Sequence, residues 1–314
     1  MKLKIKDVKN GEKGSLSVPK QFSEEIRPDI VSRAVLAIAS HNRQPYGADP
    51  EAGKKSSAEV SRRRRKYRGS YGHGISRVPR KILSRRGTRF NWVGAFAPGT
   101  IGGRRAHPPK AEKIWSQKIN DKERQKAIRS AMAATLDRTL VELRGHKIPV
   151  EYPFVISDDF QNISKTKDVI ASLKNIGFEN EVERCKDKTI RAGKGKSRGR
   201  KYRRKTGVLL VVSNQCPLEL SATNIPGVDV VNVSCLNASL LAPGTDMGRA
   251  TLFTESAMKE LEEKELFFPK TRILKEVVKI SKKTVDVLKS KSKKSEKKSS
   301  DKAEKTAKPK KDKE

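Results

Sequence analysis

The chemistry of this sequence is concentrated in one arginine-rich stretch. Between Glu59 and Glu112 there is no acidic residue, while arginine and lysine recur throughout. A guanidinium can donate two hydrogen bonds to one phosphate and can also stack on a base, which an ammonium cannot do. Interleaved aromatic side chains offer flat surfaces for unstacked bases, and frequent glycines allow the backbone to approach RNA closely. In and just before this stretch, the candidate RNA-binding residues are Arg43, Arg62, Arg63, Arg64, Arg65, Lys66, Tyr67, Arg68, Arg85, Arg86, Arg89, Phe90, Trp92, Arg104, Arg105 and His107.

A second basic cluster occupies residues 191–205 and contains a GxG sequence. A dinucleotide-binding or Walker loop follows a strand and opens a helix, whereas this cluster leads into a strand that begins at Gly207. The full GxGxxG and GxxxxGK[ST] spacings are also missing. We therefore expect a second RNA-binding surface, whose candidate residues are Lys194, Lys196, Arg198, Arg200, Lys201, Arg203 and Arg204.

Catalytic and metal-binding arrangements are not supported. Asp158 and Asp159 follow a strand beside Ser157, but adjacent carboxylates in that position more often cap a helix. The four histidines are scattered and the three cysteines form no CxxC pair, so the clustered ligands of a zinc site are missing. The sequence predicts no enzyme activity, no metal and no cofactor.

Composition points to a polyanionic partner. The chain has 314 residues with 71 Lys+Arg against 36 Asp+Glu, which gives a formal net charge of +35. Such a charge repels itself unless a polyanion neutralises it, and nucleic acid is the commonest such partner. No apolar run is long enough for a membrane span, the N-terminus has no signal-peptide pattern, and no basic amphipathic helix suggests a membrane surface. We expect a cytoplasmic protein without a membrane partner.

The elements that must position these residues fall into two groups. Residues 3–8 alternate as a strand does, and a helix begins at Pro28 and stops near His41. Periodicity is then missing from residue 43 to 110, which predicts a long functional loop that folds onto its partner. A further helix begins after Asn120, with Glu123 completing a capping box, and continues to Gly145.

The second half alternates strands and helices. Strands are expected at residues 153–157, 207–213, 228–233 and 250–253, and helices at residues 166–176 and 255–264. The uncharged, β-branched segment 207–213 is typical of a buried parallel strand. We predict a single α/β globular domain with a mostly parallel sheet flanked by helices, formed by residues 1–42 and 111–266. The loop of residues 43–110 is inserted in it, and residues 267–314 form a lysine-rich tail expected to be disordered.

Several strings resemble the universal large-subunit ribosomal protein L-four family in its archaeal and eukaryotic form. The matches run in order along residues 1–266, and the loop resembles archaeal members more than eukaryotic ones. The matching strings are RPDIV at residues 27–31, NRQPY at 42–46, TRFNWVG at 88–94, GRRAHPP at 103–109, RAGKGK at 191–196, LAPG at 241–244 and FTES at 253–256. The lysine-rich tail departs from the archaeal pattern and is like that of eukaryotic members.

The resemblance implies a structural component of the large ribosomal subunit, bound to large-subunit (23S-type) rRNA and supporting subunit assembly. It also implies that the tip of the loop lines the nascent-peptide exit tunnel, at a constriction shared with the neighbouring ribosomal protein family L-twenty-two. The nascent peptide would then be a further partner. The residues matching the family's tip are Gly72, His73, Gly74, Ile75, Ser76, Arg77, Val78 and Pro79.

Other functions remain open on the residues alone. A chromatin-like protein or general RNA chaperone would use basic arms without shape specificity and would bind any duplex equally. An α/β enzyme acting on RNA would need a catalytic carboxylate or histidine, which the acid-free loop does not provide. A flexible basic arm without fixed structure is also compatible with the composition, although the aromatic residues argue against it.

Overall fold

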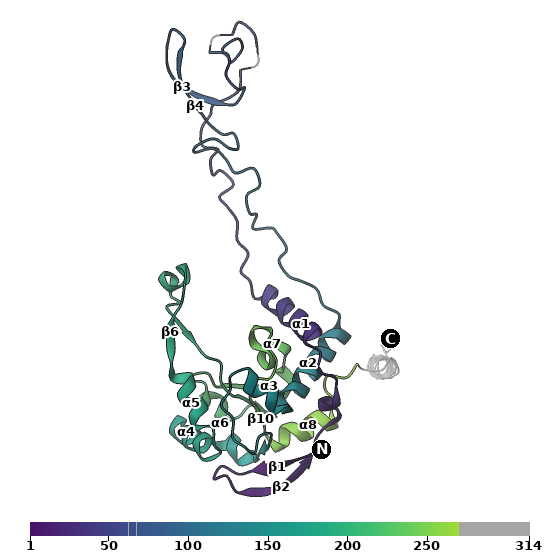
Figure 1. The fold of residues 1–314 in the computed structure, drawn as a ribbon. Helices are drawn as coiled ribbons and strands as arrows, with labels where there is room; N and C mark the ends of the chain where they lie inside the picture. Colours follow the sequence, from purple (N-terminus) through teal and green to yellow (C-terminus); the bar gives the residue numbers. More distant parts are fainter. Residues whose placement is uncertain (62, 67, 270–314) are drawn as a thin grey trace, which may run out of the picture. The chain divides into compact units, whose positions relative to one another are not determined.

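The computed structural model describes residues 1–61, 63–66 and 68–269 (Figure 1). The chain divides into two compact units. One contains Met1–Val35 and the chain from Ile119 onward, and the other is Leu36–Lys118. From residue 270 onward, the expected disordered tail lies outside the described residues.

The first unit contains two three-stranded sheets. In one, β1 (Lys2–Lys6) pairs antiparallel with β2 (Glu12–Ser17) and parallel with β5 (Val155–Ile156). In the other, β8 (Leu209–Val212) lies between β9 (Asp229–Asn232) and β10 (Thr251–Phe253), and both pairings are parallel. All four residues of β8 are buried, as expected for a central strand covered on both faces.

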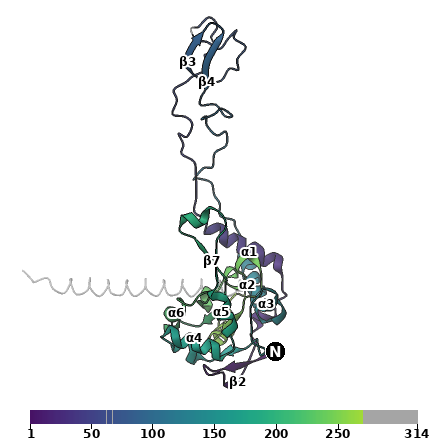
Figure 2. The same cartoon turned by 60° about the vertical axis from the view of Figure 1, so that its left-hand side comes forward.

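Helices cover this parallel sheet. Leu210 and Val212 of β8 belong to an apolar cluster with Val169, Leu173 and Val182. These last three lie on α4 (Thr166–Asn175) and α5 (Glu179–Lys186), which lie beside one another in Figures 1 and 2. Successive side chains of a strand point to opposite faces of its sheet. The helix α8 (Glu255–Glu263) also packs against β8.

The remaining α-helices are α1 (Pro28–His41), α2 (Asp121–Leu136), α3 (Arg138–Leu143), α6 (Pro217–Ala222) and α7 (Ala238–Leu241).

Two further hairpins lie outside these sheets. One is β3 (Arg80–Arg86) with β4 (Arg89–Gly94), and the other is β6 (Lys188–Ile190) with β7 (Tyr202–Arg204); both are antiparallel. The fold is therefore a mixed helix and strand arrangement, as predicted. The β10-β8-β9 sheet is wholly parallel, and in the other sheet β1 pairs parallel with β5 and antiparallel with β2. An isolated parallel bridge between Ile156 and Thr254 links the two sheets.

The prediction placed the start of α2 correctly, but the capping box that it expected there does not form. Asn120 is the N-cap residue, yet its side chain makes no capping hydrogen bond. Glu123 does not reach back to the cap; its carboxylate lies 3.1 Å from the Arg33 guanidinium of α1. A tertiary ion pair thus replaces the expected capping box.

The predicted end of this helix was also wrong. The helix stops at Leu136 rather than near Gly145, because the carboxylate of Asp137 accepts a hydrogen bond from the backbone N–H of Thr139 and begins α3. Gly145, with φ +95°, follows α3 instead. One expected helix is therefore two.

Candidate nucleic-acid interface

Within Leu36–Lys118, the expected structureless loop contains the β3–β4 hairpin. Arg85, Arg86 and Arg89 are exposed around its turn at Gly87, which has φ +56°. Arg85 donates from Nε to the Gly87 carbonyl oxygen at 3.2 Å and lies 4.8 Å from the centre of the Phe90 ring. The hairpin thus gathers three of the predicted RNA-binding arginines at one turn. The sequence did not predict this hairpin, because neither of its faces is strongly apolar and its strands therefore show no clear alternation of apolar and polar residues.

The aromatic residues of this unit pack on one another. His73 lies 4.8 Å from Phe90 and 6.3 Å from Trp92 between ring centres, and Phe90 lies 4.9 Å from Trp92. Trp92 is only 7% exposed and Phe90 is half-buried. The expectation that both rings lie open for base stacking is therefore wrong for Trp92. The structure also brings His73, assigned to a separate tip, into contact with these aromatic residues.

The arginine run before the tip is exposed. Arg63, Arg64, Arg65, Lys66 and Arg68 are all exposed, while residues 62 and 67 lie outside the described part of the chain. The guanidinium of Arg64 lies 5.4 Å from the ring centre of Tyr71, and that of Arg77 lies 4.6 Å from the same ring. The guanidiniums of Arg64 and Arg77 are therefore exposed to solvent while they lie against the same aromatic ring.

The loop has two limbs, an outgoing one that includes residues 40–53 and a returning one that includes residues 103–117. Contacts between the two limbs begin at Ser40 and Gln117. The Gln117 backbone N–H donates to Ser40 Oγ at 2.9 Å, and the Ala48 N–H donates to the Pro109 carbonyl at 2.9 Å. A Cβ added to Gly53 would lie 2.5 Å from the Gly103 carbonyl oxygen. These contacts hold the two segments of the loop close together.

A cation–π cluster at the same end was missed by sequence reasoning. The rings of Tyr46 and Trp115 stack at 5.4 Å with planes 16° apart, and Arg43 lies 3.9 Å from the Trp115 ring. Arg43 was predicted, but Trp115 lies beyond the acidic residue that ended the acid-free stretch. The interleaving of cations with aromatic rings, rather than the absence of acids, was the signal that extends to Trp115.

Three predicted residues lie on the returning limb. Arg104 is half-buried, with its guanidinium 5.6 Å from the ring centre of Phe96, while Arg105 and His107 are exposed. A Cβ on Gly103 would lie 2.2 Å from the Ala97 carbonyl oxygen, so the chain passes very close to itself here. Glycine at this position is required by that close approach.

In the first unit, the β6–β7 hairpin carries the second predicted cluster. Gly199, with φ +79°, lets the chain turn back toward β7. All seven predicted cations of this cluster are exposed and none forms an ion pair within the described residues. They are Lys194, Lys196, Arg198, Arg200, Lys201, Arg203 and Arg204.

Next to this hairpin lies a cationic cleft. Arg203 and Arg204 line it together with Arg144 and Arg184, and with Asp246 as one of its acidic residues. Arg144 donates to the carbonyl oxygens of Pro243, at 2.6 Å, and Asp246. Burial, together with the nearby Arg249 and Arg184 guanidiniums, lowers the pKa of Arg144, although Asp246 opposes the shift. Positive charge therefore exceeds negative charge in the cleft.

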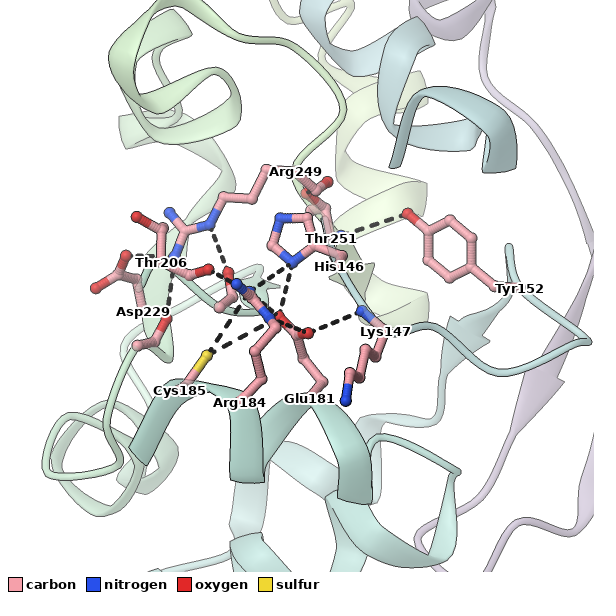
Figure 3. A network of polar contacts seen from close by, with 12 residues as sticks. His146, Lys147, Tyr152, Glu181, Arg184, Cys185, Thr206, Asp229, Arg249 and Thr251 are labelled. Carbon is pink, nitrogen blue, oxygen red and sulfur yellow. Dashed lines mark hydrogen bonds and ion pairs between the residues drawn. The ribbon is translucent and has the colours of Figure 1, made fainter. Parts of the chain in front are cut away.

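A buried network holds Arg184 in place (Figure 3). The Glu181 carboxylate accepts hydrogen bonds from Arg184 at 2.6 and 2.8 Å, from the Lys147 backbone N–H at 2.9 Å, and contacts His146 Nδ1 at 2.7 Å. Burial alone would raise the pKa of Glu181, but the bonds from Arg184, His146 and Lys147 lower it to about 2. Burial also lowers the pKa of His146. The carboxylate oxygens are fully used by these donors, so the network positions Arg184 and offers no general base.

The paired carboxylates Asp158 and Asp159 are structural. Asp158 Oδ1 accepts from the Ser256 backbone N–H at the start of α8 and from the Gln161 amide, both at 2.9 Å. Asp159 pairs with Lys13. The predicted helix-capping role is confirmed, although the helix that Asp158 caps is one almost 100 residues further along the chain.

Among the described residues, no group of three or more His, Cys, Asp or Glu side chains is placed to hold a metal ion. No helix in this part of the chain has the length and apolar character required to cross a membrane.

The sequence matches known ribosomal proteins. Residues 16–264 match the model of the ribosomal protein L4/L1 family. Large ribosomal subunit protein uL4 of Nanoarchaeum equitans is 47% identical over 269 residues, covering 85% of this chain and 100% of that protein. The uL4 proteins of Archaeoglobus fulgidus and Halobacterium salinarum are 45% and 42% identical, covering 84% of this chain and 99% and 100% of their own lengths. This chain belongs to the ribosomal protein L4/L1 family and is similar to its archaeal members.

Proposed function

We propose that this protein is a structural component of the large ribosomal subunit in the cytoplasm and that it binds large-subunit rRNA. The family is a structural one without catalytic activity, and the relatives are large-subunit proteins. The observation that carries RNA binding is the exposed β6–β7 hairpin, whose cations have no carboxylate partner among the described residues. Phosphates supply the missing negative charge.

The loop contributes a second RNA-binding surface in this proposal. Its exposed arginines at residues 63–65 and around the β3–β4 turn present guanidiniums to solvent. Residues 1–42 and 111–266 would then form the globular part, and residues 43–110 the RNA-binding insertion. Both surfaces would anchor the protein during subunit assembly.

The tip residues 72–79 are proposed to line the exit tunnel, beside a protein of the L-twenty-two family and facing the nascent peptide. Gly72 and Gly74 are exposed, with φ +75° and +67°, and a Cβ on either would meet no other atom within 4 Å. A segment of this kind offers few side chains for a passing peptide to bind, which suits the wall of a tunnel. His73 differs, because it packs against Phe90 and Trp92 and would fix the start of the tip.

The test is sedimentation of the tagged full chain in sucrose gradients of cell lysate. We expect the protein to travel with large subunits, and its recovery at the top of the gradient would refute the proposal. Deleting residues 72–79 should preserve incorporation while changing sensitivity to antibiotics that bind the tunnel. Loss of incorporation would show instead that the tip is an anchor. Equal affinity for any RNA duplex would favour a general RNA chaperone.

A further inference from the structure

A cleft lies where the two limbs of Leu36–Lys118 meet, and it has no assigned role. Its volume is about 700 Å³, and its lining includes Tyr46, Trp115, His107, Arg105 and Lys110. A volume of this order lies in the range of small-molecule sites. The cleft is thus large enough for one nucleotide.

One wall of the cleft is aromatic. Tyr46 stacks on Trp115 with ring planes 16° apart, yet Tyr46 remains 48% exposed. A half-exposed ring already stacked on a second ring is a platform on which a base can continue the stack. His107 is exposed on the same lining and offers a further flat surface.

The rim of the cleft is cationic. Arg105 and Lys110 are exposed and form no ion pair within the described residues, and Glu112 is the one acidic residue in the lining. Lys113 Nζ lies 4.4 Å from the Trp115 ring centre, and Arg43 lies within 5.4 Å of Tyr46 and 3.9 Å of Trp115. Arg105, Lys110 and Lys113 outnumber the single carboxylate in the lining, so an anionic group would be attracted to the cleft.

Trp115 leaves a donor unused. Its indole Nε1 is buried and has no hydrogen-bond partner in the described structure. Buried donors are normally paired, so an unpaired one indicates that a partner is missing. A ligand oxygen within hydrogen-bond distance of Nε1 would supply the acceptor.

The alternative is that the Tyr46–Trp115 stack only holds the two limbs together, and such a structural role does not require all of these features. Holding the limbs together requires only the Tyr46–Trp115 stack and the backbone hydrogen bonds between them. It needs neither exposed cations beside the rings nor an unused donor, and the buried donor without a partner has a cost.

We propose that this cleft binds one unstacked nucleotide of single-stranded RNA, with its base on Tyr46 and its phosphate near Arg105 and Lys110. This proposal rests on the proposed function, in which RNA is the partner of the loop, and it specifies how one site on the loop binds that RNA. Double-stranded RNA would not fit, since its bases are already stacked and unavailable.

The experiment compares short uridine and adenine oligonucleotides with a ribose-phosphate chain of equal length that lacks bases. Binding to the full-length protein is measured at fixed salt. The wild type should bind the base-bearing chains about 10-fold more tightly or better, as expected for stacking on an aromatic side chain. Tyr46→Ala should abolish this preference, and Tyr46→Phe should keep it, because the ring and its stack on Trp115 remain.

Leu220→Ala serves as the control, because Leu220 is an exposed apolar residue of α6, outside both proposed RNA-binding surfaces. It should leave the base preference unchanged. An unchanged preference in Tyr46→Ala, or an equal loss in Leu220→Ala, would overturn the proposal. If the wild type binds large-subunit rRNA but does not prefer base-bearing chains, only this inference fails. If it binds no RNA, the proposed function fails with it.

Discussion

Substituting Glu181 by glutamine tests the buried network directly. The side chain is 1% exposed and accepts bonds from Arg184, His146 and the Lys147 backbone N–H. A carboxyl whose pKa falls from 4.5 to about 2 stabilises the folded state by about 3 kcal/mol at neutral pH. Breaking a buried ion pair on one side has a similar cost of about 3–5 kcal/mol. We therefore expect Glu181→Gln to lose about 3 kcal/mol of unfolding free energy at pH 7.

The dependence on pH follows from the direction of the shift. A depressed pKa stabilises the protein above the unfolded value near 4.5, and this stabilisation is lost as the pH falls toward about 2. The difference between wild type and Glu181→Gln should therefore be constant above pH 5 and shrink below 4.5. Lowering of the His146 pKa by burial acts in the same direction, since protonation of the buried ring destabilises the fold.

The assay is urea denaturation followed by circular dichroism at several pH values. Glu183→Gln is the matched control, because Glu183 is an exposed residue of the same helix and makes no ion pair among the described residues. It should change the unfolding free energy by less than about 0.5 kcal/mol. A Glu181→Gln protein as stable as the wild type at pH 7, or a difference that persists unchanged at pH 2.5, would refute the reasoning.

Three further outcomes can be measured. Burial raises the pKa of the Cys185 thiol to about 11, so in the native protein at pH 8 a thiol reagent should modify exposed Cys235 and leave Cys185 untouched until urea is added. Met132→Ala, in a fully buried position of α2, should lower the unfolding free energy by about 2–5 kcal/mol, measured as a lower urea midpoint. Replacing Arg203 and Arg204 by alanine should reduce the slope of log affinity for rRNA against log salt by about 1.8, and an unchanged slope would show that neither contacts phosphate.

The sequence predicted the strands β1, β5, β8, β9 and β10 and the helices α1, α2, α4 and α8, but not β2, β6, β7, α3, α5, α6 or α7. Segment 207–213 is uncharged and β-branched, and it forms the buried central strand β8. The helix from Pro28 to about His41 and the helix that ends before Gly177 were also predicted to within a residue or two. These predictions succeeded because periodicity and terminal residues act locally. The capping box at Asn120 failed because Glu123 has a tertiary partner, Arg33.

The candidate site was predicted by composition and corrected by contacts. An acid-free run of arginines identified the loop, since charge is a property of the sequence alone. The β3–β4 hairpin was not predicted, because backbone pairing there does not depend on an apolar face. Tyr46 and Trp115 lie far apart in the sequence, and only the path of the two limbs brings their rings into contact.

The sequence by itself determined the charge and the order of the main elements, and the charge is the reason why we expect a polyanionic partner. The tertiary structure decided which side chains remain available. It buries Trp92, pairs Arg184 with Glu181, and leaves the cations of the β6–β7 hairpin exposed. The physical reason is that a side chain's availability depends on what lies against it. Those neighbours come from distant parts of the chain, which local propensity and composition do not specify.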